Sequence, residues 1–371
     1  FCAFALAGYT VDLRVLFNAI CLVIRIIIVN FACNQQQTIM EYIKLGATDL
    51  RLSVIAYGSF AIGGTMWGGT DEADSIAAVR ASIDNGITSI DTAPFYGFGL
   101  SEEMIGKAIK GHDRSRVQLL TKFGLVWDGS NAGRGERSGN AIKDGKTIEV
   151  YKYTARENIL KEVEESLRRL DTDYIDLLQL HWPDNTTPIS ETMETLDLLV
   201  KQGKIRAAAV CNYSVEQLEE AAKSIQLASN QVPYSMLNRR IEEQLVPYAL
   251  EHNLGIIAYS PMARGLLTGK YFEGGQLKAD DHRNEYFSRF NLARVETMLN
   301  HLKPLAAEKQ ATLAQLVLRW TTLQKGISVV LAGARNAEQA ISNAAAMSFS
   351  LSDDELLFIA REIDVCTAKQ F

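Results

Sequence analysis

Four residues that can hold or release a proton lie at, or just past, the ends of short apolar runs. They are Asp91 in T-S-I-D-T-A-P-F-Y-G, Tyr96 five residues later, Lys122 in L-L-T-K-F-G and His181 in L-Q-L-H-W-P. Side chains at several strand ends converge only if those strands are parallel and belong to one sheet. In a (β/α)8 barrel, the C-terminal ends of the strands carry the catalytic groups. We therefore expect these four residues to form one site.

Together, these residue types can deliver a proton to a carbonyl oxygen. Tyrosine is a weak acid with an ordinary pKa of about 10, and a nearby lysine cation lowers the pKa of a tyrosine. Asp91 can keep Lys122 charged and oriented, and His181 can hydrogen bond to the carbonyl oxygen. No side chain supplies a hydride, so reduction of the carbonyl requires a nicotinamide cofactor. No strand-like run is followed by G-x-G-x-x-G, so the phosphates need a different binding arrangement.

From Met40 onward, apolar strand-like runs alternate with amphipathic helical runs. Eight such units predict an α/β fold, a (β/α)8 TIM barrel, as a single domain over residues 40–371. The alternating pattern of Tyr42–Gly46 and Leu50–Ser53 predicts a β-hairpin that closes the bottom of the barrel. Long loops over the C-terminal face are expected at 123–153 and 261–291, where substrate specificity usually resides. The expected strands are Val54–Gly58, Ser89–Thr92, Val117–Lys122, Tyr174–His181, Ile205–Cys211, Asn230–Tyr234, Gly255–Tyr259 and Ile327–Leu331.

Composition narrows the class of protein. Of 371 residues, 47% are hydrophobic and 22% are charged, which is typical of a globular protein with a full core. The net charge of −6 argues against a nucleic-acid partner. The five cysteines and five histidines have no metal-ligand or disulfide spacing, so we expect no metal and a cytoplasmic protein. We also expect a monomer or a weak homo-oligomer, although no residue pattern names the oligomeric state. The charged helical segment Arg156–Arg169 is expected to be a solvated face.

The first 39 residues differ from the rest. Val15–Cys33 is apolar and β-branched, but Asn18, Arg25 and Asn30 interrupt it. An arginine at the centre of a membrane helix costs about 2.5–3.5 kcal/mol on insertion scales. We expect residues 1–39 to be non-native sequence or an unstructured apolar extension, with a membrane anchor and a genuine extension as the alternatives.

Jointly, these motifs resemble those of the aldo-keto reductases, from about Met40 to Asp364. In that family, D-T-A-x-x-Y-G, T-K and L-x-H-x-P-D supply an Asp–Tyr–Lys–His tetrad, which the resemblance places on Asp91, Tyr96, Lys122 and His181. The segment Ala61–Glu72 and H-W-P-D at 181–184 look most like a bacterial general-stress branch of NADPH-dependent reductases. The resemblance implies NADPH-dependent reduction of aldehydes or ketones to alcohols.

The resemblance also implies an NADP(H) site. Asn212 and Gln231 match the ligands of the nicotinamide carboxamide, with Cys211 in place of the usual serine, and Tyr259 matches the ring that stacks on the nicotinamide. Ser260–Lys270 matches the loop over the pyrophosphate. The whole expected set is Ser59, Phe60, Asp91, Cys211, Asn212, Gln231, Tyr259, Ser260, Pro261, Met262, Arg264, Gly265, Lys270, Gly333, Arg335, Gln339 and Asn343.

Within that set, the segment Gly333–Asn343 matches G-x-R-x-x-x-Q-x-x-x-N. Arg335 is expected to contact the adenosine 2′-phosphate, because a guanidinium is planar and always charged. Gln339 and Asn343 are expected to hold the adenine. These residues favour NADP over NAD.

The expected substrate-pocket residues are Trp67, Tyr96, Phe123, Trp127 and Trp182. For Trp67 and Trp127, packing within the protein is an equal alternative. Nothing in the long loops names the carbonyl substrate. A different class of function also remains open, an NADPH-binding regulatory or redox-sensing subunit of a partner protein, as in the resembling potassium-channel β subunits.

Overall fold

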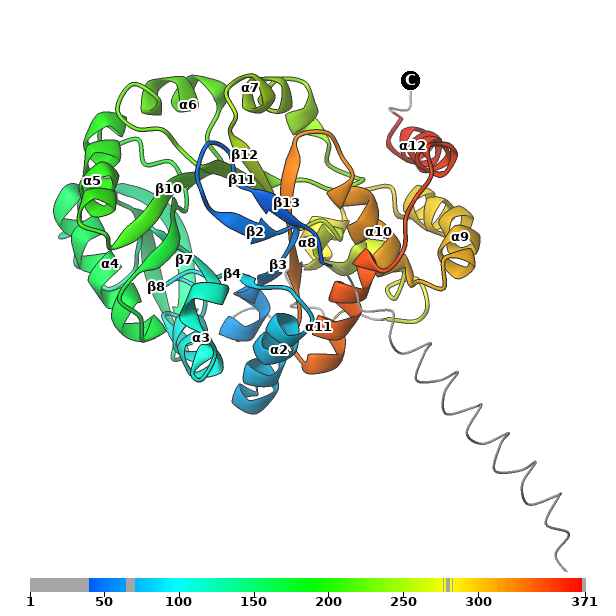
Figure 1. The fold of residues 1–371 in the computed structure, drawn as a ribbon, viewed down its shortest axis with the longest axis horizontal. Helices are drawn as coiled ribbons and strands as arrows, with labels where there is room; N and C mark the ends of the chain where they lie inside the picture. Colours follow the sequence, from blue (N-terminus) through cyan, green and yellow to red (C-terminus); the bar gives the residue numbers. More distant parts are fainter. Residues whose placement is uncertain (1–39, 65–70, 276, 278–280, 282, 369–371) are drawn as a thin grey trace, which may run out of the picture. The chain divides into compact units, whose positions relative to one another are not determined.

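The computed structural model describes residues 40–64, 71–275, 277, 281 and 283–368. Within that part, eight parallel strands close into a barrel in the order of the sequence (Figure 1). The (β/α)8 prediction is confirmed, and the expected strands agree with the observed ones to within two residues at each end. The strands are β3 (Ile55–Gly58), β4 (Ser89–Asp91), β5 (Gln118–Phe123), β9 (Ile175–Leu180), β10 (Ile205–Cys211), β11 (Ser229–Pro233), β12 (Gly255–Tyr259) and β13 (Ile327–Gly333).

Helices surround the barrel (Figure 1). Between strands they are α2 (Glu72–Asp84), α3 (Leu100–Ile109), α4 (Arg156–Leu170), α5 (Ile189–Lys201), α6 (Val215–Ala221), α7 (Leu245–Glu251), α8 (Arg283–Phe287), α9 (Leu292–Glu308) and α10 (Leu313–Thr322), and after β13 they are α11 (Ala337–Ala344) and α12 (Asp353–Thr367). Short 3-10 turns are η1 (Ser59–Gly63), η2 (Arg114–Arg116), η3 (Arg240–Glu242), η4 (Ala263–Thr268) and η5 (Ala345–Met347). No helix in the described ranges is both long and apolar enough to cross a membrane. The prediction for residues 1–39 lies outside the described residues.

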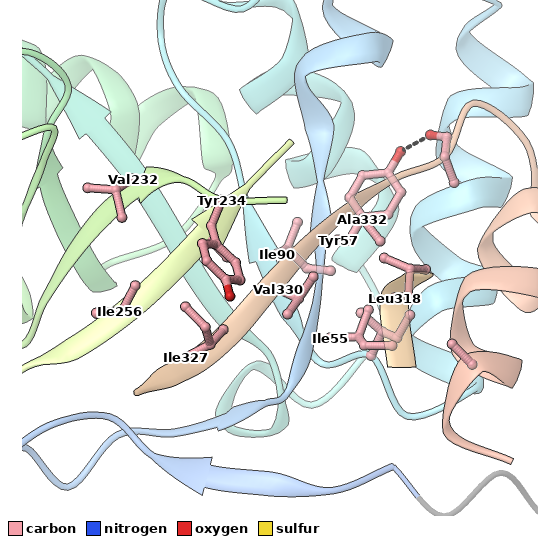
Figure 2. Packing of buried hydrophobic residues seen from close by; sticks show 14 of the residues in the cluster. Ile55, Tyr57, Ile90, Val232, Tyr234, Ile256, Leu318, Ile327, Val330 and Ala332 are labelled. Atoms are coloured by element: carbon pink, nitrogen blue, oxygen red, sulfur yellow. Dashed lines mark hydrogen bonds between the residues drawn. The ribbon is translucent and has the colours of Figure 1, made fainter. Parts of the chain in front are cut away.

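The core has two layers because successive side chains of a strand point to opposite faces of the sheet. The outer layer lies between strands and helices, where Ile55, Ile90 and Val330 from neighbouring strands pack with Leu318 of α10 (Figure 2). The inner layer fills the barrel with a separate cluster that includes Leu120, Leu177 and Ile257. In β5, Leu120 belongs to the inner layer, so Lys122, two residues later, also lies on the inner side at the C-terminal rim.

The predicted N-terminal hairpin is present. Strand β1 (Tyr42–Lys44) pairs antiparallel with β2 (Arg51–Ser53). Leu45, Leu50 and Leu52 of this hairpin belong to the inner cluster. A Cβ added to Gly255, the first residue of β12, would lie 2.5 Å from Leu45. The hairpin therefore closes the N-terminal end of the barrel, opposite the rim that carries the expected site.

The segment 123–153, expected to be a loop, contains a small sheet instead. Strands β6 (Leu125–Val126), β7 (Glu136–Lys143) and β8 (Lys146–Lys152) pair antiparallel in the order β6-β8-β7. Residues Asp144 and Gly145 join β7 to β8 with positive φ angles of 49° and 73°. Asp-Gly is a strong two-residue hairpin signal, so the sequence did carry the information for this element.

Candidate active site

Asp91 and Lys122 form an ion pair at the C-terminal rim of the barrel. Asp91 is the last residue of β4, and Lys122 lies on the neighbouring strand β5. Lys122 Nζ donates to Asp91 Oδ1 at 2.6 Å and to the Thr92 carbonyl at 2.9 Å. Each of the two charged residues is 1% exposed. Burial alone would lower the pKa of Lys122, but Asp91 and Tyr96 raise it above its ordinary value, so the lysine is charged.

The second oxygen of Asp91 is held by two amide side chains. Gln179 Nε2 and Gln231 Nε2 donate to Asp91 Oδ2 at 3.0 and 2.8 Å. Gln231 Nε2 also donates to Gln179 Oε1 at 3.1 Å. Both glutamines are buried. Three strands, β4, β9 and β11, therefore fix the orientation of one carboxylate, and the sequence had given no role to Gln179.

Tyr96 is positioned by backbone contact as well as by ring packing. It follows β4 in a turn, and Gly97 has a φ of +66°. A Cβ at Gly97 would lie 2.2 Å from the Gly63 carbonyl oxygen, and one at Gly63 would lie 2.7 Å from the Tyr96 carbonyl carbon. The turn therefore rests directly on the end of η1. The Phe60 ring also packs against the Tyr96 ring, with centroids 5.0 Å apart.

Lys122 and Tyr96 are coupled electrostatically. Lys122 Nζ lies 5.0 Å from the centroid of the Tyr96 ring. Burial raises the pKa of Tyr96, Lys122 lowers it, and the net result is a pKa of about 12. The expected effect of the lysine is present, but desolvation exceeds it. Tyr96 is therefore protonated at neutral pH, as a proton donor must be.

His181 completes the group. It follows β9, and its ring lies edge-on to the Tyr96 ring with centroids 5.7 Å apart. Burial and the Lys122 cation lower the pKa of His181 well below its ordinary value. Its imidazole is neutral at physiological pH, so it carries one N–H donor. The structure thus brings all four predicted residues together.

Asn212 and Tyr259 lie at neighbouring positions on the same rim. Asn212 follows β10 with a left-handed φ of 61°, its Nδ2 donates to the His181 carbonyl at 3.3 Å, and its Oδ1 accepts from the Tyr259 hydroxyl at 3.1 Å. Cys211 is buried beside them, and burial raises the pKa of its thiol.

The segment after β12 has further left-handed residues. Ser260, Ala263 and Arg264 have φ values of 56°, 47° and 57°, and Gly265 follows with 96°. Pro261 is buried, Met262 is half-buried and Lys270 is exposed. The Arg264 guanidinium lies 4.4 Å from the centroid of the Tyr286 ring in α8. Ala263, Gly265 and Leu267 donate their backbone N–H groups to carbonyls of Ser260 and Met262, so the coil is closed by its own hydrogen bonds.

The loop around Arg335 is held by hydrogen bonds from three side chains. The Tyr57 hydroxyl of β3 donates to the Ala334 carbonyl at 2.7 Å (Figure 2). Gln339 Oε1 accepts from the Arg335 backbone N–H at 3.0 Å, and Asn343 Nδ2 donates to the Gly333 carbonyl at 3.0 Å. Gln339 and Asn343, expected to hold adenine, are thus seen to shape this loop. The exposed Arg335 stands directly before α11, whose N-terminus attracts anions.

Two of the expected cofactor residues, Ser59 and Phe60, follow β3 and are less exposed than Arg335. Ser59 is buried, and the Ser101 hydroxyl donates to its Oγ at 2.7 Å. Phe60 is half-buried against Tyr96. Within the described ranges, no group of three or more His, Cys, Asp and Glu residues could hold a metal ion.

The expected substrate-pocket residues lie in different surroundings. Trp127 packs against Phe95 and Phe98, with ring centroids 5.9 and 5.7 Å away, and Trp182 is 39% exposed beside His181. Phe123 departs from the expectation. It is 1% exposed and belongs to the outer cluster, because it follows Lys122 on the strand and points to the opposite face. Trp67 lies outside the described residues.

The sequence of this chain matches the model of a known protein family. The family model described as "Aldo/keto reductase family" matches residues 54–361. The chain belongs to the aldo/keto reductase family. That match spans all eight barrel strands and the four residues of the site, and the chain is therefore an oxidoreductase of this family.

The relatives of this aldo/keto reductase include proteins named as reductases and one named as a probable channel subunit. Aldo-keto reductase YhdN of Bacillus subtilis is 41% identical over 304 residues, 81% of this chain and 86% of that protein. An NADH-specific methylglyoxal reductase of Escherichia coli is 37% identical over 323 residues, 85% of this chain and 95% of that protein. A probable voltage-gated potassium channel β subunit of Oryza sativa is 31% identical over 322 residues, 83% of this chain and 91% of that protein.

Solved structures of aldo/keto reductases have the same fold. A glycerol dehydrogenase from Gluconobacter oxydans has a TM-score of 0.78 at 35% identity, covering 89% of this chain and 97% of that one. An aldo/keto reductase from Klebsiella pneumoniae, solved in complex with NADP and acetate, has a TM-score of 0.65 at 29% identity, covering 90% and 98%.

Proposed function

We propose that this protein reduces aldehydes or ketones to alcohols, with NADPH as the reductant and Tyr96 as the general acid. The observation that carries the proposal is the buried Asp91–Lys122 pair beside the Tyr96 ring. Burying a charged pair is costly, and this pair lies at the barrel end where catalytic groups are built. A carbonyl reductase needs a proton donor at that end of the barrel, and the charged pair beside Tyr96 makes this tyrosine suitable as the donor.

The described residues fit a nicotinamide nucleotide. Gln231 uses its Nε2 on Asp91 and Gln179, which leaves its Oε1 for an amide N–H of the carboxamide. Asn212 and Tyr259 lie beside it on the rim, and Arg264 and Arg335 offer cations for phosphates. When bound, the nicotinamide supplies the hydride.

The protein supplies the proton. Tyr96 donates its hydroxyl proton to the carbonyl oxygen, and Lys122 stabilises the tyrosinate that remains. Asp91 keeps the lysine charged, and both glutamines keep Asp91 in place. Neutral His181 donates its single N–H to the same oxygen and stabilises the negative charge that develops there.

Single residues and relatives support the finer assignments. Exposed Arg335 before α11 favours a 2′-phosphate and hence NADPH, while the E. coli relative is named as NADH-specific. The 41% identity to the B. subtilis protein supports membership of a bacterial branch. The exposed or half-buried Trp182 and Trp127 are the proposed pocket residues.

Turnover tests the proposal. Purified protein should consume NADPH, followed at 340 nm, with at least one of a panel of reactive aldehydes, and it should bind NADPH more tightly than NADH. The regulatory-subunit alternative, which the identity to the rice channel subunit favours, predicts tight NADPH binding with no consumption across the whole panel. That second result would overturn the proposed reductase function.

A further inference from the structure

The hairpin of β7 and β8 has two faces with different surroundings. Ala141, Lys143 and Ile148 are half-buried and Val150 is buried, whereas the alternate residues, among them Ile142, are exposed. Because the side-chain period of a strand is two, the first set shares the face that lies against the body of the protein. In the sequence, the hairpin follows β5, the strand of Lys122, after the short strand β6.

The inner face of this hairpin reaches the loop that carries Tyr96. Lys143 Nζ lies 5.5 Å from the centroid of the Phe98 ring, two residues after Tyr96. Phe98 packs in turn against Phe95 and Trp127, with centroids 5.7 Å away in each case. The tip of the hairpin therefore sets a cation over an aromatic cluster next to the proposed proton donor.

A second lysine stands beside the first. Lys143 and Lys146 are paired across the β7–β8 turn, and like charges in directly opposite positions destabilise a hairpin. The other basic residues of the segment 124–153 have carboxylate partners: Arg134 pairs with Glu157, Arg137 with Glu149 and Lys152 with Glu136. Among the described residues, no carboxylate pairs with Lys143 or Lys146. An anion between them would relieve their repulsion.

We propose that Lys143 and Lys146 form an anion-recognition site at the mouth of the active site, which selects carbonyl substrates that carry a carboxylate. The Phe95–Phe98–Trp127 cluster would hold the apolar body of such a substrate between the lysines and Tyr96. The inference rests on the proposed function, since it names the substrate class of that site.

The test compares 4-carboxybenzaldehyde with its methyl ester, which has a similar size and carbonyl reactivity but no charge. We expect Lys143→Gln and Lys146→Gln each to raise KM for the acid by about 5- to 10-fold, as the loss of one charge-assisted contact at a half-exposed site would. The kcat for the acid, and both constants for the ester, should stay within about 2-fold. Lys44→Gln, which removes one charge from the opposite end of the barrel, is the matched control.

Two results would overturn the inference. If acid and ester respond equally to Lys143→Gln, the lysine only packs on Phe98, and Lys146→Gln, which leaves that contact intact, should then have no effect. If neither variant changes KM for the acid, the pair recognises no anion. Binding of the acid, followed by tryptophan fluorescence, gives the same comparison without turnover. Failure of the wild type to consume NADPH with the acid, the ester and every aldehyde of the panel would refute the proposed function, while the fluorescence titration would still decide the anion site.

Discussion

Replacing Asp91 by asparagine should destabilise the protein by about 3–5 kcal/mol, because it leaves a buried lysine without its counter-charge. Lys122 is 1% exposed, and its Nζ lies 2.6 Å from Asp91 Oδ1. The carboxylate accepts from three nitrogens, on Lys122, Gln179 and Gln231. Asparagine offers one oxygen to these donors, and its own NH2 must face at least one of them.

A double-mutant cycle separates the charge from the packing. Lys122→Met removes the cation and leaves Asp91 with its two amide donors, so we expect a smaller loss of stability. The double variant, Asp91→Asn with Lys122→Met, should lose about 1–3 kcal/mol less unfolding free energy than the two single variants lose together. The assay is unfolding by urea at pH 7, with the slope of the transition compared among variants.

An exposed pair is the matched control. Lys161 Nζ lies 2.8 Å from Asp128 Oδ2, but these side chains are 40% and 48% exposed. Asp128→Asn should cost less than about 1 kcal/mol. The reasoning is refuted if Asp91→Asn costs no more than Asp128→Asn, or if the two changes at the buried pair are simply additive.

Three further predictions concern single groups. Burial raises the pKa of Glu162 to about 8, so between about pH 4.5 and 8 the folded protein keeps a proton that the unfolded chain has released. The wild type should therefore lose stability relative to Glu162→Gln as the pH rises through that window. If the denaturant midpoints of the two proteins differ by the same amount at pH 5 and pH 8, the prediction is wrong. Arg335→Gln should raise the Kd for NADPH at least ~10-fold and the Kd for NADH less than ~2-fold, measured by fluorescence titration, whereas equal changes would remove Arg335 from the 2′-phosphate. With Tyr96 at a pKa of about 12 and the pKa of His181 far below its ordinary value, kcat/KM should show no ionisation between about pH 6.5 and 9, and an inflection there that disappears in His181→Gln would contradict the neutral imidazole.

The barrel could be predicted because its strands are buried on both faces. Runs such as 175–180 are rich in leucine and isoleucine, although Asp176 and Gln179 interrupt this one, and turn-rich segments separate them from the helices. Because the ends of these strands can be recognised in the sequence, Asp91, Lys122 and His181 could be assigned to strand ends, where the closed sheet brings them together.

The polar support of the site was harder to predict. Gln179 lies within an apolar run that carries no motif at this position, yet its amide donates to Asp91. Its partner, Gln231, is 52 residues away in the sequence, and only closure of the barrel makes them neighbours. No local sequence pattern can indicate a contact between residues that far apart in the chain.

The hairpin and one position of a charged helix differ from the prediction for another reason. Strands β7 and β8 are mostly polar and belong to a separate three-stranded sheet, so they lack the apolar signal of a core strand. The Asp144-Gly145 turn is the strong sign of this hairpin in the sequence. In α4, Glu162 was taken as part of a solvated face. It is 8% exposed and accepts from the Gly124 backbone N–H, which the helical period alone could not show.

Substitution of Tyr96 by phenylalanine tests the central claim most directly. The variant keeps the ring that packs against Phe60 and His181 and loses only the hydroxyl. With NADPH and an aldehyde that the wild type reduces, loss of absorbance at 340 nm should slow by about 10²–10⁴-fold, while the Kd for NADPH stays unchanged. A Tyr96→Phe variant that reduces the aldehyde at the wild-type rate would show that this tyrosine is not the proton donor.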